Sequence, residues 1–289
     1  MRVLTHTVTE TEDGRTVKSL AIREMRLSRS LFGSLKFSGG VTVDGEQARA
    51  DMRLRPGQVL AFALRDGGAA LTPYALPLRI PYEDADFFII DKPAPLPTLC
   101  SAHQAGPTLE NALYAHLNCP ADFVFRPVNR LDKGTSGLMA AAKNAHAQQL
   151  LQRRLHTGAF IREYLAVCRG KLPEGAGEID LPIGRGSGVK REICPDGQKA
   201  LTRYRVEKEG DGLSLVRLWL ETGRTHQIRV HLAALHCPIV GDYLYGEADD
   251  RLPGRFALHS AYLRFIHPLT GEEVALRSQL PPELAALMA

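Results

Sequence analysis

The polar and apolar positions of the first 72 residues predict helices followed by short strands. Residues 19–37 have a helical pattern, and the glycine pair at 39–40 suits the end of a helix. Short strands are predicted at 41–43 and 59–62, with a turn at Asp44–Gly45. This segment is therefore expected to form a small module of helices and a hairpin.

From residue 82 onward, helical and strand patterns alternate. The predicted elements are strands at 86–91, 138–142, 163–167 and 213–220, helices starting at 109 and spanning 143–157, and a hairpin of 256–266 with 273–276. Thr108 is placed to cap the first of these helices, whose leucines at 109, 113 and 117 share one face. Residues 213–220 are apolar on both alternating faces, which is typical of a strand at the centre of a sheet.

Three prolines separate the two regions. Pro73, Pro77 and Pro81 predict a linker over 73–81. The chain of 289 residues suits two domains of the usual size, ~100–200 residues each. We therefore expect a module of 1–72 and a larger domain of 82–289.

The composition excludes several classes of protein. A hydrophobic fraction of 44% and a charged fraction of 24% are typical of a folded chain. The longest apolar runs are about six residues, far short of the ~20 that span a bilayer, and the N-terminus has no apolar signal region. Five cysteines without a CxxC pair are expected to be reduced thiols. These features predict a cytoplasmic protein with no membrane partner.

The net charge of +4 conceals two basic blocks. Residues 15–36 hold six Lys or Arg against one acid, and residues 126–169 hold eight against two. A polyanion-binding surface needs such blocks, although solvated protein faces also contain them. The blocks are compatible with a nucleic acid partner.

One candidate site is the polar, turn-rich loop of residues 126–137. Arg130 and Lys133 flank Asp132, and their opposite charge favours the ionised carboxylate. A fixed carboxylate can act as a nucleophile or as an electrostatic stabiliser, and Gly134 and Gly137 allow tight turns and close approach of a ligand. The alternative is an aspartate that caps a turn and pairs with a neighbouring arginine.

A second candidate segment leaves the strand at 213–220 and enters a helix that Thr225 is placed to cap. Arg224 lies at this junction, from which a guanidinium can reach across a cleft. His226, His231 and His236 are five residues apart, a spacing that places neighbours on different faces of a helix or strand. Because metal ligands on a helix usually recur at three or four residues, we expect no metal site here.

A third candidate is Tyr164, the aromatic residue in the basic segment 162–167. Such a tyrosine is usually part of a core. Beside a basic cleft it can instead stack on a nucleobase.

Together these segments carry a specific resemblance. In order and spacing they resemble the motifs of the large-subunit-type (RluA-like) RNA pseudouridine synthases. The matching segments are NRLDKGTSGLM, REYLAVCRG, ETGRTHQIRVHLAALHCPIVGDYLYG and ALHSAYLRFIHPLTGEE. FFIIDKPAPLPT resembles that family's opening strand and KP turn, so the resemblance covers about residues 82–276. The segment SRSLFGSLKFSGGVTVDGEQARADMRLRPGQVLAF resembles the small S4-like RNA-binding module that precedes the catalytic domain in many members.

The resemblance implies an α+β catalytic domain with a mixed, largely antiparallel sheet and a central cleft. It implies that Asp132 is the catalytic carboxylate, that Arg224 pairs with it, and that Tyr164 packs on the target uracil. It assigns Arg130 to holding the RNA as the base leaves the stack, and Leu258 to an apolar wall of the uridine pocket. Asn129 and Lys133 complete the expected uridine-binding loop.

Two positions depart from the family pattern. The family usually has H-R-L-D where this chain has Asn129, and K-x-Y where it has Arg162. An asparagine still donates and accepts hydrogen bonds, so the first change concerns the orientation of the loop more than the chemistry. Arginine in place of lysine keeps the charge but not the geometry.

The implied reaction converts uridine in ribosomal or transfer RNA to pseudouridine. The N1–C1′ bond breaks, the uracil turns, and a C5–C1′ bond forms, with no oxidation and no added group. No cofactor is therefore expected, and neither G-x-x-x-x-G-K-[ST] nor G-x-G-x-x-G occurs in the chain. A carboxylate beside C1′ can attack the sugar or assist departure of uracil through a glycal, and the sequence leaves both routes open. The uridine must be flipped out of the RNA in either case.

Parts of the sequence are also compatible with two other functions. Asp132-Lys-Gly-Thr resembles the D-K-T-G-T loop of aspartyl-phosphate enzymes, but no hydrophobic strand precedes it, and Gly241-Asp242 is the only later acidic fragment of that kind. A non-catalytic RNA-binding protein with a retired synthase domain is the main alternative, and the intact Asp132, Tyr164 and Arg224 argue against it. We expect a monomeric enzyme whose partner is RNA.

Overall fold

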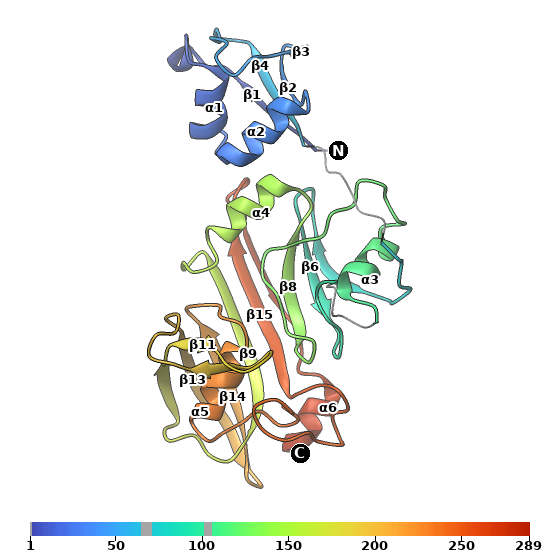
Figure 1. The fold of residues 1–289 in the computed structure, drawn as a ribbon, viewed down its shortest axis with the longest axis vertical. Helices are drawn as coiled ribbons and strands as arrows, with labels where there is room; N and C mark the ends of the chain where they lie inside the picture. The colour runs from blue at the N-terminus through green and yellow to red at the C-terminus, as the bar shows by residue number, and fades with distance from the viewer. Residues whose placement is uncertain (1, 65–70, 101–105) are drawn as a thin grey trace.

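The structure is a computed structural model that describes residues 2–64, 71–100 and 106–289 (Figure 1). An N-terminal module contains a four-stranded sheet in the order β1-β4-β2-β3. Its elements are β1 (Arg2–Thr7), η1 (Glu10–Glu12), α1 (Val17–Arg23), α2 (Arg29–Phe37), β2 (Val41–Val43), β3 (Glu46–Gln47) and β4 (Val59–Leu64). The predicted strands and the turn at Asp44–Gly45 are confirmed, since both turn residues have positive φ between β2 and β3.

The single helical segment predicted over residues 19–37 is two helices. Arg26 has a φ of 56°, which an α-helix does not accommodate, and the Ser28 side chain accepts a hydrogen bond from the Leu31 amide to begin α2. The two helices pack through Leu20 and Phe32 in a core that is separate from the cores of the larger domain.

The larger domain is organised by a ten-stranded sheet. Along the sheet the order is β10-β13-β14-β9-β15-β8-β6-β5, with β16 paired to β15 and β7 to β8. The strands are β5 (Arg79–Glu83), β6 (Phe87–Lys92), β7 (Arg126–Pro127), β8 (Ser136–Ala142), β9 (Phe160–Arg169), β10 (Ala176–Asp180), β13 (Leu201–Gly210), β14 (Leu213–Leu220), β15 (Leu258–Ile266) and β16 (Glu273–Arg277). Every pairing in it is antiparallel except that of β15 with β8. A mixed, largely antiparallel α+β fold is therefore confirmed.

Alternating side chains give the sheet two buried faces. Phe87 and Ile89 of β6 enter one core with Ala147 and Leu151, whereas Ile90 enters the core on the other face. The remaining elements are α3 (Leu109–His116), α4 (Ala145–Gln152), β11 (Ile183–Arg185), β12 (Arg191–Ile193), α5 (Gln227–Ala234), α6 (Pro282–Ala285) and η2 (Ala286–Met288). Figure 1 shows α4 at the end of the domain that faces the N-terminal module.

Several predicted boundaries need correction. The helix expected over 143–157 is shorter, since α4 spans Ala145–Gln152. The Asn144 side chain caps its start by accepting from the Ala147 amide, and residues 153–156 form turns. Pro81, expected in a linker, lies within the edge strand β5. Before β5, Leu76 and Leu78 pack against the core of the larger domain. This proline-rich segment is thus partly attached to the domain that follows it.

The parallel pairing of β8 and β15 depends on a glycine. Gly137 has a φ of +103°, and a Cβ atom there would lie 2.3 Å from the backbone oxygen of Ser260. Figure 1 shows β15 running between β8 and β9, so this contact joins the two halves of the sheet.

Replacing Gly137 with alanine should lower the free energy of unfolding by about 2–4 kcal/mol, because the new methyl group meets backbone and the positive φ disfavours it. Urea denaturation measures the change. Gly271→Ala is the matched control: its φ is +81°, but no atom lies within 4 Å of the added Cβ. Equal losses in the two variants would show that the contact with Ser260 is unimportant.

Candidate active site

Asp132 lies in the loop between β7 and β8, and contacts with neighbouring segments fix that loop. The Thr135 amide donates to the Asp132 carbonyl oxygen at 3.1 Å, which closes a tight turn. The Leu96 amide donates to the Lys133 carbonyl, and the Thr98 hydroxyl donates to the Leu131 carbonyl at 2.7 Å. The Asp132 side chain is 29% exposed, so it is fixed yet accessible.

Arg229 holds the Asp132 carboxylate. Its Nη1 donates to Asp132 Oδ2 at 3.0 Å, while Nε and Nη2 donate to the two oxygens of Asp242 at 2.7 and 2.8 Å. The guanidinium carbon lies 4.2 Å from the centre of the Phe256 ring and 5.0 Å from that of Tyr245. Burial alone would lower the pKa of Arg229, but hydrogen bonds and charge from Asp242 and Asp132 raise it. Arg229 is therefore a permanent, oriented cation.

This geometry corrects the expected partner of Asp132. Arg224 was predicted to pair with Asp132, but its Nε donates to the Lys199 carbonyl at 3.0 Å. The expected cap at Thr225 is also wrong, because His226 is the N-cap and has a φ of 60°. The helix therefore begins at Gln227, and its first turn directs Arg229 inward while Arg224 stays at the rim of the cavity.

A cavity of about 600 Å³ lies beside Asp132, and six of the seven predicted site residues line it. These are Asn129, Arg130, Asp132, Lys133, Tyr164 and Arg224. A smaller recess of about 60 Å³ has Asp132 and Tyr164 among its lining residues and adds Arg229 and the seventh, Leu258. The structure thus brings all seven residues to one place from four separate segments.

Tyr164 forms a buried wall of this cavity. It is 4% exposed and lies on β9 opposite Ser260 of β15 and Leu218 of β14. Burial raises the pKa of Tyr164, so the hydroxyl stays protonated at neutral pH. Its ring is a neutral surface next to the Asp132 carboxylate.

Asn129 secures the loop to the sheet. Its Oδ1 accepts a hydrogen bond from the Ala140 amide at 2.9 Å, and its buried Nδ2 has no hydrogen-bond partner among the residues that the structure describes. The substitution at this position therefore preserves an anchor for the loop. On the other side, Lys92 of the KP turn donates to the carbonyls of Pro93 and Leu96, and burial lowers the pKa of Lys92 to about 7.

Two of the three histidines of the second segment, His226 and His231, have local partners. His226 Nδ1 lies 2.8 Å from the Tyr245 hydroxyl, and its Nε2 lies 4.0 Å from Asp132 Oδ2. His231 bonds to the Thr202 hydroxyl and to the Leu181 carbonyl, each at 2.9 Å. Within residues 2–64, 71–100 and 106–289, no three His, Cys, Asp or Glu side chains gather as a metal site requires.

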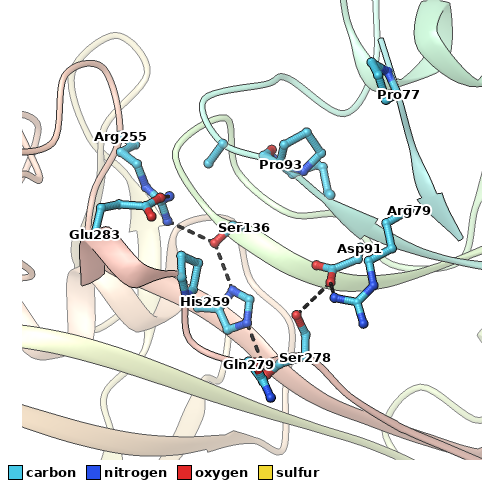
Figure 2. Close-up of a pocket in the computed structure, with 13 residues that line it drawn as sticks. Pro77, Arg79, Asp91, Pro93, Ser136, Arg255, His259, Ser278, Gln279 and Glu283 are labelled. Carbon is cyan, nitrogen blue, oxygen red and sulfur yellow. Dashed lines mark hydrogen bonds and ion pairs between the residues drawn. The ribbon is translucent and has the colours of Figure 1, made fainter. Parts of the chain in front are cut away.

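A polar network supports the other end of the Asp132 loop. Figure 2 shows Ser136, the first residue of β8, between Arg255 and His259, and each bond is 2.9 Å long. Nearby, the Ser278 hydroxyl donates to Asp91 at 2.8 Å, linking the C-terminal segment to β6. These residues line a separate cavity of about 330 Å³ that contains none of the seven predicted site residues.

Two residues of the site escaped prediction from sequence. Arg229 and Asp242 lie in the same motif as Arg224, and both are almost fully buried. The available signal was a cation within the apolar helix QIRVHLAAL, since a buried charge requires a partner.

Comparisons with known proteins agree on one family. A model of the RNA pseudouridylate synthase family matches residues 86–234. The Bacillus subtilis protein named "Uncharacterized RNA pseudouridine synthase YjbO" is 37% identical over 94% of this chain and 98% of its own length. The Vibrio parahaemolyticus "Ribosomal large subunit pseudouridine synthase D" is 37% identical over 99% of this chain and 93% of its own.

Solved structures show the same similarity. The structure of human "RNA Pseudouridylate Synthase Domain Containing 1" superposes with a TM-score of 0.60 at 32% identity, over 73% of this chain and 87% of that one.

Within the described parts of the chain, no helix has the length and apolar character needed to cross a membrane.

Proposed function

The chain belongs to the RNA pseudouridylate synthase family and is an RNA pseudouridine synthase, and on that premise we propose that Asp132 is the carboxylate that acts at C1′ of the target uridine. The observation that carries this proposal is the chain of contacts from Asp242 through Arg229 to Asp132 Oδ2, at the edge of an open cavity. A carboxylate fixed in this way has its second oxygen available to the substrate. The non-catalytic alternative is not favoured.

The cavity suits a uridine flipped out of RNA. The uracil packs on the Tyr164 ring with Leu258 beside it, and the sugar faces Asp132. Asp132 then attacks C1′ or assists the departure of uracil, and Arg229 holds the carboxylate in position throughout. The freed uracil turns and joins C1′ through C5; in the first route this breaks the Asp132–C1′ ester and releases the carboxylate, and in the glycal route the proton removed from C2′ returns to it. The proton lost from C5 is balanced by the proton gained at N1, so no cofactor is consumed.

We assign the substrate to structured RNA, with ribosomal RNA as the first candidate. One relative is named as a ribosomal large subunit enzyme, and the cavity has Arg130, Lys133 and Arg224 at its border. The enzyme is proposed to act in the cytoplasm as a monomer. Mapping pseudouridine in total RNA from cells with and without this protein tests the proposal, and the absence of any changed uridine would contradict it.

We further propose that the N-terminal module is an S4-like RNA-binding arm. Six basic residues lie between positions 15 and 36, and the module's core is separate from that of the catalytic domain. The module contacts that domain through Arg2 with Asp86 at 3.1 Å and through Gln149 with the Arg26 carbonyl at 3.4 Å.

Removal of residues 1–72 should weaken RNA binding while changing saturating kcat much less, because the lost phosphate contacts form in ground and transition states alike. Each lost contact should reduce the slope of log affinity against log salt by roughly 0.7–0.9. Binding titrations at several salt concentrations measure this slope.

A full-length control removes two charges only. Arg29→Gln with Lys36→Gln changes two exposed residues of α2 and should lower the slope by about half as much as a truncation that loses four contacts. Full affinity and an unchanged slope in the truncated enzyme would contradict the RNA-binding assignment. A soluble truncated enzyme without turnover at saturating RNA would mean that the module completes the active site.

A further inference from the structure

Arg162 is a buried cation without a counter-ion. It is 6% exposed, its Nη2 makes a long contact to the Leu155 carbonyl at 3.4 Å, and its guanidinium carbon lies 5.7 Å from the centre of the Phe160 ring. Its Nε has no hydrogen-bond partner among the described residues. Among the residues that the structure describes, no carboxylate oxygen lies within 4.0 Å of its guanidinium. The other two buried arginines, Arg229 and Arg255, each have a carboxylate partner. A buried charge left unpaired is costly, so the position of Arg162 needs an explanation.

Arg162 lines the cavity that contains Asp132, two residues before Tyr164 on the same face of β9. Two residues of strand separate their Cα atoms by about 7 Å, which is within the span of one nucleotide. Arg162 also lies on the side of Tyr164 toward His156 and Gly223, away from the small recess that contains Leu258.

A second cation, Arg224, lines the same cavity as Arg162. Burial, together with the charges of Arg162 and Arg224, lowers the pKa of His156. Arg224, which lines the rim of the cavity, donates through its Nε to the Lys199 carbonyl, and in the described parts of the chain no carboxylate pairs with it. At Gly223 a Cβ atom would lie 3.6 Å from Arg162 Nη1, so the glycine keeps the space in front of the guanidinium free of a side chain.

We propose that Arg162, with Arg224 at the rim, binds a backbone phosphate of the RNA next to the target uridine. The inference rests on the proposed function, since it assumes that the uracil packs on Tyr164. Uracil is neutral and does not require a cation, whereas a phosphate supplies the missing negative charge and matches the planar guanidinium with paired hydrogen bonds. The site selects a nucleotide within a strand over a free nucleoside.

The first test needs no turnover. Uridine, uridine 5′-monophosphate and uridine 3′-monophosphate are titrated against the full-length protein by NMR, and their Kd values are compared. We expect at least one monophosphate to bind about tenfold more tightly than uridine. Arg162→Gln should abolish this preference, and Arg162→Lys should retain part of it because the charge remains. Arg277→Gln removes an equal charge from the edge strand β16 and should leave the preference unchanged.

Folding and chemistry are controlled separately. Thermal unfolding of Arg162→Gln establishes whether the variant is folded, and Arg162→Lys provides a second variant if it is not. Asp132→Asn should keep the preference for the monophosphate, since it alters the chemistry and not the phosphate site. A wild-type protein that binds uridine and both monophosphates equally, or an Arg162→Gln protein with an undiminished preference, would overturn the proposal.

The second test uses RNA that contains the mapped uridine. A single neutral methylphosphonate replaces each flanking phosphate in turn, and kcat/KM is measured. One replacement should lower the wild-type value by about tenfold or more and the Arg162→Gln value by less than about threefold; additive losses at every linkage would contradict the assignment. If mapping finds no pseudouridine while the monophosphate preference holds, the proposed function fails and the phosphate site stands. The reverse outcome would refute the phosphate site alone.

Discussion

Asp132→Asn is expected to reduce pseudouridine formation by at least about a thousandfold, equivalent to ~4 kcal/mol of activation free energy. The amide is neither a nucleophile nor a charge that can stabilise the separating sugar. Folding should be nearly unaffected, because Arg229 keeps its two bonds to Asp242 and the Asp132 side chain is partly exposed. Single-turnover assays with excess enzyme, together with RNA-binding titrations, separate the chemical step from binding.

Asp211→Asn is the matched control for this variant. Asp211 is an exposed residue in the turn between β13 and β14, outside the cavity, so the same change of group should leave turnover near the wild-type rate. Turnover by Asp132→Asn within about tenfold of wild type would show that another residue performs the chemistry.

Arg229→Lys is expected to lower kcat by at least about a hundredfold and to destabilise the fold by about 1–3 kcal/mol. Three nitrogens of the guanidinium are each bonded to Asp132 or Asp242, and a lysine ammonium cannot reproduce that planar arrangement. Asp242 is fully buried, and lysine would pair with it less completely than arginine. A buried charge that is incompletely paired lowers the free energy of unfolding. Urea denaturation and saturating kcat measure the two effects.

Arg217→Lys controls for the loss of a bridging arginine. Arg217 also joins two carboxylates, those of Glu163 and Glu207, but it does not line the cavity. Its variant should retain near-normal turnover. Normal kcat in Arg229→Lys would show that the pairing with Asp132 is unimportant for the reaction.

Local patterns predicted eight of the sixteen strands in the described residues, and the site residues that lie within single motifs; β1 and the ten-residue strand β13 were among those missed. Residues 213–220 form β14 as expected, and Asp132 and Tyr164 border one cavity. The partner of Asp132 was not predictable in this way. Its identity depends on where α5 begins, and the left-handed backbone at His226 moves that start beyond Thr225. A shift of one residue at the helix start, from a cap at Thr225 to a cap at His226, accompanies the change in which arginine points inward.

Contacts between residues far apart in the chain could not be predicted from local sequence patterns either. The parallel pairing of β15 with β8 joins residues more than 120 positions apart, and no local periodicity encodes it. The sequence indicated Gly241-Asp242 only as an acidic fragment of the aspartyl-phosphate alternative, and the folded chain places Asp242 against Arg229. The break between α1 and α2 was signalled by Ser28, a good capping residue inside an otherwise helical pattern.

The position of β15 has a consequence for the order in which the enzyme becomes active. A ribosome synthesises the Asp132 loop and Tyr164 early, but β15 (Leu258–Ile266), which separates β8 from β9, emerges late. Until that strand inserts, β8 and β9 are not joined through it, and the sheet that positions the Asp132 loop beside Tyr164 is incomplete. A nascent chain that ends before residue 258 should therefore be catalytically silent, and during refolding the recovery of turnover should coincide with the completion of the central sheet. Catalytic activity should therefore appear only at a late stage of folding.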